Sequence, residues 1–224
     1  MSEKTSTWIL WTTIGRKVLL ALSGLALFFF LIFHLLGNFT LFVKDPGIFN
    51  QYAYTLERMG FILYVMEGLL ILTFLVHILD AIFVTLENRK ARSSSYYKEG
   101  NAGKPSRKSL SSKTMIYTGL LVFAFVVFHV KMFKYGAHYV AQNSNIRDLH
   151  RLVVECFKTD YIVISYCIAM ILLGLHLRHA FFSAFQSLGI AHPKYTPYIE
   201  KLGILFAIAI AGGFLSIPVW IYFH

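Results

Sequence analysis

The chain has 224 residues, of which 57% are hydrophobic and 14% are charged, and its net charge is +10. A soluble globular domain has about 25% charged residues, so this composition excludes a soluble enzyme or binding domain. A chain of this length also cannot surround several wholly apolar helices with polar ones, which leaves an integral membrane protein as the fold class.

Five apolar stretches are each long enough to cross a bilayer, which takes about 20 residues of helix. In chain order they cover residues 17–43, 59–86, 115–135, 161–188 and 198–222. They occupy most of the chain, so the sequence predicts one all-α integral membrane domain over residues 1–224, built as a bundle of five transmembrane helices. The first stretch is too long for a cleavable signal peptide, and no small-residue cleavage site follows it.

Basic residues gather on one side of these stretches. The loop at about residues 89–113 carries eight of them: Arg89, Lys90, Arg92, Lys98, Lys104, Arg107, Lys108 and Lys113. With the N-terminal tail and the link after the fourth stretch, this side has 13 Lys and Arg against 7 on the other. The positive-inside rule therefore puts the N-terminus and the basic loop in the cytoplasm and, after five crossings, the C-terminus outside. Since this bias accounts for the loop, no nucleic-acid partner is needed, and the same residues could dock a cytoplasmic protein.

The remaining links are short. Asp45-Pro46-Gly47 predicts a turn, and Glu57-Arg58 is expected to open the second span. The link at 136–159 predicts a short surface helix at 150–156, while residues 91–112 are typical of a flexible loop. Gly24 predicts a close approach of a neighbouring helix. No repeat is evident, and Cys156 and Cys167 lack a metal or covalent-haem motif, which indicates free thiols.

Each of the first four stretches contains one deeply placed histidine. At 1.5 Å of rise per residue, His34 and His129 lie about 24–27 Å from the inner ends of their helices, and His77 and His176 about 18–20 Å. They therefore form an inner pair, His77 with His176, and an outer pair, His34 with His129. Two haem irons stacked across a bilayer need this arrangement, since neutral imidazole is a usual axial ligand.

Other readings of these histidines are weaker. A single intramembrane histidine is often hydrogen-bonded to a neighbouring helix, but that does not explain four that pair by depth. A zinc site would need its ligands to converge on one point. His179 is the rival of His176, whose depth matches His77 better. Arg178 and His179 lie nearer the cytoplasm, where they could bind the propionates of an inner haem or extend to the headgroups.

Several short segments, taken in order, carry a family resemblance. They are Phe33-His34-Leu35 with Gly37-Asn38-Phe39, Phe49-Asn50-Gln51 leading to Glu57, Val76-His77-Ile78, Phe128-His129-Val130, and His176 thirteen residues before Gly189-Ile190. In these segments the chain resembles the di-haem cytochrome b subunit of succinate:quinone oxidoreductase, the membrane anchor of respiratory complex II. The resemblance covers nearly the whole chain and favours His176 over His179 as the fourth ligand.

This resemblance implies a role in the respiratory chain and the tricarboxylic acid cycle, in the cytoplasmic membrane. A flavoprotein subunit with covalent FAD and an iron–sulfur subunit would bind on the cytoplasmic side, and the complex could form a higher oligomer. Electrons would pass from the iron–sulfur subunit through two haems b to a quinone, often menaquinone. The chain alone should not oxidise succinate. Some fumarate-reducing members have a glutamate two residues before the fourth ligand; Gly174 stands here, so that proton route is not carried over.

A quinone site near the outer pair needs a group that exchanges protons as the ring is reduced. Glu57 is the best-placed candidate, and Glu67 lies deeper in the same span. Glu57 could instead be a solvated acid at a helix start, where negative charge is favourable. Asn50, Gln51 and Tyr54 are candidates for lining the site.

Two alternatives stay open at this point. One is the cytochrome b subunit of a hydrogenase or formate dehydrogenase, which the fifth span fits less well. The other is a haem-free transporter or proton channel that uses intramembrane histidines. A reduced α-band with two haems per chain would favour the cytochromes over the transporter.

Overall fold

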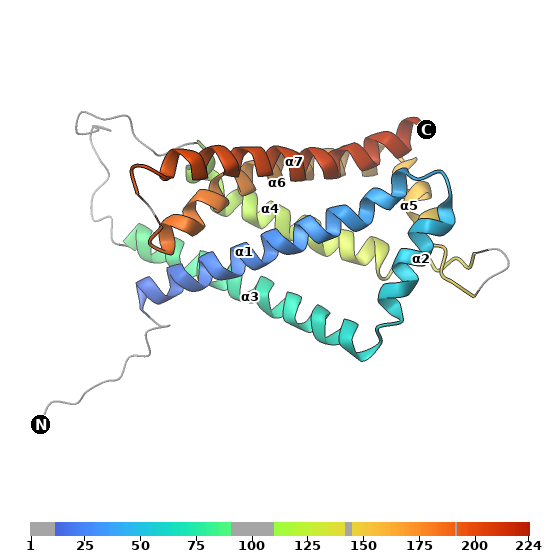
Figure 1. Cartoon of the computed structure of the whole chain (residues 1–224), viewed down its shortest axis with the longest axis horizontal. Helices are drawn as coiled ribbons and strands as arrows, with labels where there is room; N and C mark the ends of the chain where they lie inside the picture. Colours follow the sequence, from blue (N-terminus) through green and yellow to red (C-terminus); the bar gives the residue numbers. More distant parts are fainter. Residues whose placement is uncertain (1–11, 91–109, 142–144, 191) are drawn as a thin grey trace, which may run out of the picture.

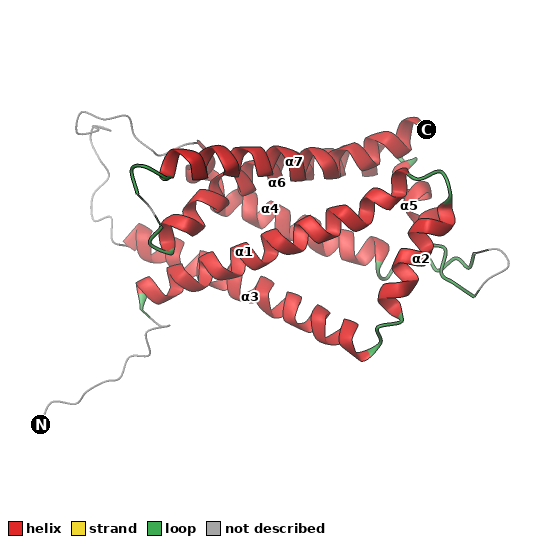
Figure 2. Ribbon diagram, in the orientation of Figure 1, coloured by secondary structure: helices red, strands yellow, loops and turns green. Residues whose placement is uncertain are grey.

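A computed structural model describes residues 12–90, 110–141, 145–190 and 192–224. Figures 1 and 2 show that this part of the chain is mostly helical, with short connecting loops except for the longer one between Phe133 and Leu149. The elements are α1 (Thr13–Asn38), the 3-10 helix η2 (Phe39–Phe42), α2 (Pro46–Glu57), α3 (Phe61–Lys90), α4 (Leu110–Phe133), α5 (Leu149–Phe157), α6 (Asp160–Ser187) and α7 (Thr196–Phe223).

Five of these helices, α1, α3, α4, α6 and α7, are long and apolar enough to cross a membrane. The predictions of an all-α fold and of five membrane-spanning helices are therefore confirmed at that level. The short helices α2 and α5 lie at the end of the bundle where α7 finishes (Figure 1). Because the number of spans is odd, α1 starts at the opposite end. Which end faces the cytoplasm stays a prediction.

Four of the long helices form a ring. α1 packs against α3 and α6, and α4 packs against α6 and, less closely, α3. As a result, α1 lies diagonally opposite α4, and α3 lies diagonally opposite α6. Helix α7 packs on the outside of α6. In such a bundle, side chains from diagonal helices can meet in the middle, where cofactor sites of four-helix bundles are built.

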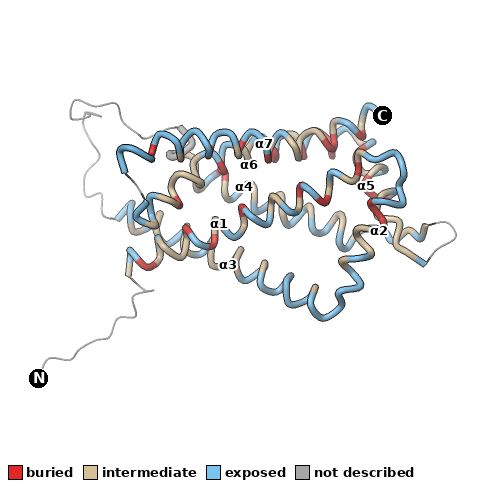
Figure 3. The backbone as a smooth tube through the Cα atoms, viewed as in Figure 1, coloured by how far each residue is buried: buried red, intermediate tan, exposed pale blue. Residues whose placement is uncertain are grey.

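Burial is uneven around this ring. The core clusters lie between α1, α6 and α7, and at the end where α2 and α5 pack, with Leu35, Phe49, Phe157, Met170 and Ile210 among their buried members. By contrast, no residue of α3 is buried, and Figure 3 shows its whole length as intermediate or exposed. A helix that exposes apolar side chains on most of its surface is suited to contact with lipid.

The link before the second span contains a helix that was not predicted. Asp45 caps α2 by accepting a hydrogen bond from the Gly47 N–H at 2.8 Å, and Pro46 occupies its first turn, where the missing N–H is harmless. The prediction that Glu57 opens the second span is wrong, because Glu57 is the last residue of α2. The chain reverses through Gly60, whose φ of 55° is in the left-handed region, before α3 begins.

The predicted surface helix at 150–156 is confirmed as α5, which is tied to α2 by one buried side chain. Asn50 is 5% exposed and donates from Nδ2 to Asp148 Oδ1 at 2.8 Å. Its Oδ1 accepts from the His150 backbone N–H, also at 2.8 Å. Asp148 in turn caps α5 by accepting from the Arg151 N–H at 3.1 Å. Asn50 thus has a structural role, and it is not available to line a quinone site.

Other expectations have mixed outcomes. Cys156 and Cys167 are free thiols, as predicted. Pro218 is buried and lies inside α7 without interrupting it. Most of the predicted basic loop, at residues 91–109, lies outside the described residues.

The exposed surface of α5 gives a prediction of pH dependence. Glu155 accepts hydrogen bonds from the Tyr139 hydroxyl at 2.6 Å and from Arg151 Nε at 2.8 Å, and these two groups hold the pKa of Glu155 below its ordinary value. Since the folded-state pKa is lowered, the stabilisation is present above the unfolded pKa of about 4.3 and is lost as the pH falls through the folded value. We expect the hydrogen-exchange protection of α5 to weaken in acid, and the acid response to be smaller in Glu155→Gln. An equal response in both proteins would contradict this.

Candidate functional site

The four predicted histidines come from the four helices of the ring, and the structure brings them together in two pairs. The ring centroids of His34 and His129, from the diagonal helices α1 and α4, are 5.8 Å apart, with an interplanar angle of 89°. Those of His77 and His176, from α3 and α6, are 6.4 Å apart, with an angle of 71°. These are the two pairs that depth predicted. Their role as iron ligands stays a prediction.

The distance between the ring centroids of each pair can be compared with the distances expected for a shared metal and for a direct hydrogen bond. Imidazole nitrogens bind metal ions at about 2.0–2.1 Å, so two rings that share one metal along a straight axis have centroids roughly 6.3 Å apart. A direct hydrogen bond of about 2.9 Å between ring nitrogens would bring the centroids to roughly 5.2 Å. The observed 6.4 Å of the inner pair matches the first value, and the 5.8 Å of the outer pair lies between the two. Among the described residues, no hydrogen bond joins the two rings of either pair.

Each imidazole also has a polar group beside Nδ1. His77 Nδ1 lies 3.3 Å from Ser23 Oγ, and His176 Nδ1 lies 3.3 Å from Thr118 Oγ1. His129 Nδ1 lies 3.1 Å from the Tyr166 hydroxyl.

His34 differs from the other three. Its Nδ1 is 3.4 Å from the amide nitrogen of Asn38, which also donates to the His34 carbonyl at 2.7 Å. In the described chain, the side-chain partners of all four imidazoles lie at Nδ1. Metal-binding histidines commonly engage one ring nitrogen with a neighbour and ligate through the other, so all four leave Nε2 for that purpose.

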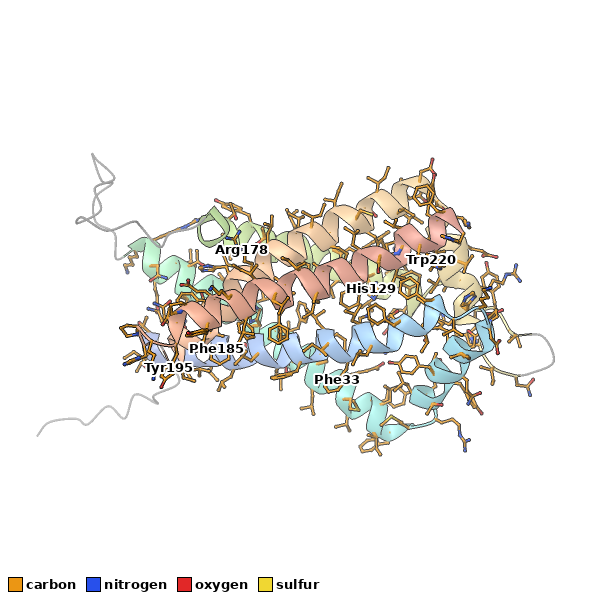
Figure 4. The ribbon with its side chains drawn as sticks, turned by 45° about the horizontal axis from the view of Figure 1, so that its top comes forward. Phe33, His129, Arg178, Phe185, Tyr195 and Trp220 are labelled. Carbon is orange, nitrogen blue, oxygen red and sulfur yellow. The ribbon has the colours of Figure 1, made fainter. Side chains whose placement is uncertain are left out.

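The surroundings of the rings are apolar and aromatic. Phe30 stacks on His34 at 5.3 Å, and Phe125 lies beside His129 at 5.8 Å. All four histidines are half-buried, so protein side chains alone do not enclose them. Figure 4 shows His129 among the side chains of the bundle, with Arg178 near one end.

The structure also places the two other candidates on α6. His179 lies one turn from His176 on a similar face, and its Nε2 contacts Ser183 Oγ at 3.0 Å. Among the described residues no other imidazole makes a ring contact with His179, whereas His176 meets His77. Arg178 is exposed and lies about 200° around the helix from His176. Its placement does not favour contact with a group held by the inner pair, and its proposed role stays a prediction.

Unlike the histidines, the candidate residues of the quinone site are not brought together in one cluster. Glu57 is exposed at the end of α2, and its side chain has no partner among the described residues. Glu67 forms an ion pair with Lys134, which ties α3 to the end of α4. Gln51 is exposed, and Tyr54 lies 5.9 Å from the Arg58 guanidinium.

Sequence reasoning missed four polar side chains at these sites. Three are the groups that contact Nδ1: Ser23, Thr118 and Tyr166. The fourth is Tyr52, whose hydroxyl packs against Gly37, one turn beyond His34. Burial raises the pKa of Tyr52, so its hydroxyl stays protonated at neutral pH. The absence of a side chain at Gly37 was the available signal for that contact.

Within the described ranges, no group of three or more His, Cys, Asp or Glu side chains could hold a metal ion. Comparison of the chain with models of protein families gives no match. Comparisons with curated proteins and with solved structures give none either. The functional argument therefore depends on the histidine pairs and on the residues that carry the resemblance.

Proposed function

We propose that this chain is the membrane-anchor subunit of a succinate:quinone oxidoreductase and holds two haems b, one at each histidine pair. In this role it passes electrons between an iron–sulfur subunit and a membrane quinone, for which we propose menaquinone. One observation carries the proposal: two pairs of imidazoles from diagonal helices meet at two levels, with ring centroids 5.8 and 6.4 Å apart.

Two protein ligands per site favour haem over a simple metal ion. Zinc in proteins takes three or four protein ligands, whereas a porphyrin supplies the four equatorial ligands of its iron and leaves two axial positions. When bound, a haem with two histidine ligands supplies a one-electron redox couple and has no open position for oxygen. The residues present therefore fit haem, and they fit electron transfer better than oxygen chemistry.

The chain's own residues have separate tasks in this proposal. The four imidazoles would hold the two haems, and the apolar helix faces would exclude water from them. His179, one turn nearer the start of α1 than His176, and Arg178 are proposed to serve the propionates of the inner haem. Of these two, only His179 lies on the face of α6 that carries His176.

The basic end of the bundle is proposed to face the cytoplasm and to bind the iron–sulfur and flavoprotein subunits of the complex. Arg89 and Lys90 are exposed in the last turn of α3, and Lys194 and Lys201 are exposed near the start of α7. All four lie at the end where α1 starts. This positive surface suits both the inner face of a cytoplasmic membrane and an acidic partner.

Glu57 is proposed to exchange protons with the quinone at the opposite end. Replacing Glu57 by Gln keeps the size of the side chain and removes its proton exchange, so quinone-linked turnover should fall at least about tenfold. The haem spectrum and both midpoint potentials should not change. Glu155→Gln, another exposed acid at the same end, is the control and should turn over normally. Unchanged turnover in Glu57→Gln would exclude this role.

Purification of the chain from its native membranes in mild detergent tests the whole proposal. We expect two haems per chain, two components in a redox titration of the α-band, and a flavoprotein and an iron–sulfur protein among the bound subunits. A colourless preparation would reject the proposal and favour a transporter or channel. Two haems together with hydrogenase or formate dehydrogenase subunits would favour the other cytochrome family.

A further inference from the structure

Each imidazole of the inner pair is contacted by a hydroxyl residue and the glycine that follows it. Ser23-Gly24 on α1 contacts His77, and Thr118-Gly119 on α4 contacts His176. In each case the hydroxyl oxygen is 3.3 Å from Nδ1. In each case a Cβ placed on the glycine would lie 3.2 Å from Cε1 of the ring. A larger residue at either glycine would push the ring away, so hydroxyl and glycine together form a close cradle for one edge of the imidazole.

The two cradles belong to an internal repeat, which appears when the segments that end in His34 and His129 are aligned. Residues 23–34 read SGLALFFFLIFH and residues 118–129 read TGLLVFAFVVFH, with six of the twelve positions identical. Each segment starts with the cradle and ends, 11 residues later, with a histidine of the outer pair. Phe30, which stacks on His34, and Phe125, which lies tilted beside His129, occupy equivalent positions as well.

The long helices that follow the two repeated segments also have equivalent roles. The cradle on α1 holds the histidine of α3, and the cradle on α4 holds the histidine of α6. The hairpins α1–α3 and α4–α6 are thus two related halves. In a two-fold arrangement, a residue meets its own equivalent only at the axis. His34 meets His129 and His77 meets His176, so both pairs lie on one approximate two-fold axis, and 11 residues of helix separate the two levels by about 16 Å.

Hydrogen bonding decides which ring nitrogen carries the proton. Ser23 Oγ donates its one proton to a backbone carbonyl, with Leu19 O at 2.8 Å and Leu20 O at 3.2 Å. Thr118 Oγ1 donates to Met115 O at 3.0 Å. A hydroxyl that donates to a carbonyl is left to accept from the imidazole, and in this arrangement the ring proton is on Nδ1 and the lone pair is on Nε2. Both rings are then acceptors at Nε2, the state that a shared metal requires.

We propose that Ser23 and Thr118 are equivalent positioning residues of the inner iron site. Each fixes the tautomer and the orientation of one ligand imidazole, and the adjoining glycine allows the contact. This inference depends on the proposed haem function. A hydrogen bond from Nδ1–H makes Nε2 a stronger donor to the metal, which favours the oxidised iron over the reduced iron. Loss of either hydroxyl should therefore raise the midpoint potential of the inner haem only.

The test uses four variants of the intact complex: Ser23→Ala and Thr118→Ala, which remove a hydroxyl, and Ser23→Thr and Thr118→Ser, which exchange the residues of the two halves. Redox titration and the low-spin ferric EPR signals are the readouts. We expect each Ala variant to shift one titration component upward. A tenfold change in the preference for oxidised over reduced iron corresponds to about 59 mV for a one-electron couple. The exchange variants should keep the parental potentials.

The outcomes separate this inference from the proposed function. Ala variants with two haems, parental potentials and parental EPR signals would overturn the positioning role and leave the cytochrome assignment intact. Loss of the inner haem in an Ala variant, with retention in Thr118→Ser, would support it. Loss of the inner haem in Thr118→Ser as well would overturn the positioning role. That variant keeps the hydroxyl, so the loss would result from altered packing. Absence of haem from the parent protein would overturn the proposed function itself.

Discussion

Replacing His176 by Ala is expected to remove the inner haem and leave the outer one, which halves the haem content of the purified chain. His176 meets His77 across the bundle at a centroid distance of 6.4 Å, and Ala supplies no replacement ligand. His179→Ala is the matched variant, since it removes an imidazole one turn away on a similar face. It should keep both haems, because the His179 ring contacts Ser183 and it is His176 whose ring meets His77.

The measurement is the ratio of extractable haem to protein, together with the redox titration of the α-band. The His176 variant should show a ratio of one instead of two and lose one titration component. His129→Ala should also give a ratio of one but lose the other component. Loss of haem only in the His179 variant would show that the ligand assignment on α6 is wrong.

Replacing Asn50 by Ala is expected to destabilise the end of the bundle where α2 meets α5, by about 2–4 kcal/mol. The substitution removes two hydrogen bonds of a buried amide and leaves the Asp148 carboxylate and the His150 N–H without these partners. Asp148 also caps α5, so this helix should loosen together with α2.

Hydrogen exchange of the α2 and α5 amides in a fixed detergent measures this effect directly. Gln51→Ala is the control, because Gln51 is the adjacent residue and is exposed; surface substitutions of this kind usually change stability by less than about 0.5 kcal/mol. Equal protection in the two variants would mean that Asn50 does not hold the two helices together.

The spans could be predicted because bilayer thickness sets the length of an apolar helix, and composition alone reveals such stretches. The helix α2 could not, because Asp45-Pro46-Gly47 suits both a turn and a helix start. Packing against α5 through Asn50 favours the helix, and the sequence does not display that long-range contact. The predicted start of the second span was wrong for a related reason. Glu57-Arg58 looks like the start of a helix, but the chain reverses after these residues, at Gly60.

The pairing of the histidines could be predicted because helical rise fixes depth. Rise alone does not say which face a side chain occupies, so Arg178 and His179 seemed equally well placed until the structure separated them. Ser23 and Thr118 were missed for another reason. A hydroxyl in an apolar helix usually bonds to its own backbone, and these two do so while also meeting an imidazole. The repeat becomes apparent only when the two segments are aligned on their histidines.

Helix α3 supplies His77 to the inner pair, yet none of its residues is buried by the protein. In a bilayer, acyl chains would cover the outer side of that helix. Delipidation with a short-chain detergent should detach α3 before the other helices of the ring, while α7 still covers α6. In the proposed cytochrome, the bilayer would then be a structural component of the inner site, and the absorbance of the inner haem would report on how much native lipid a preparation retains.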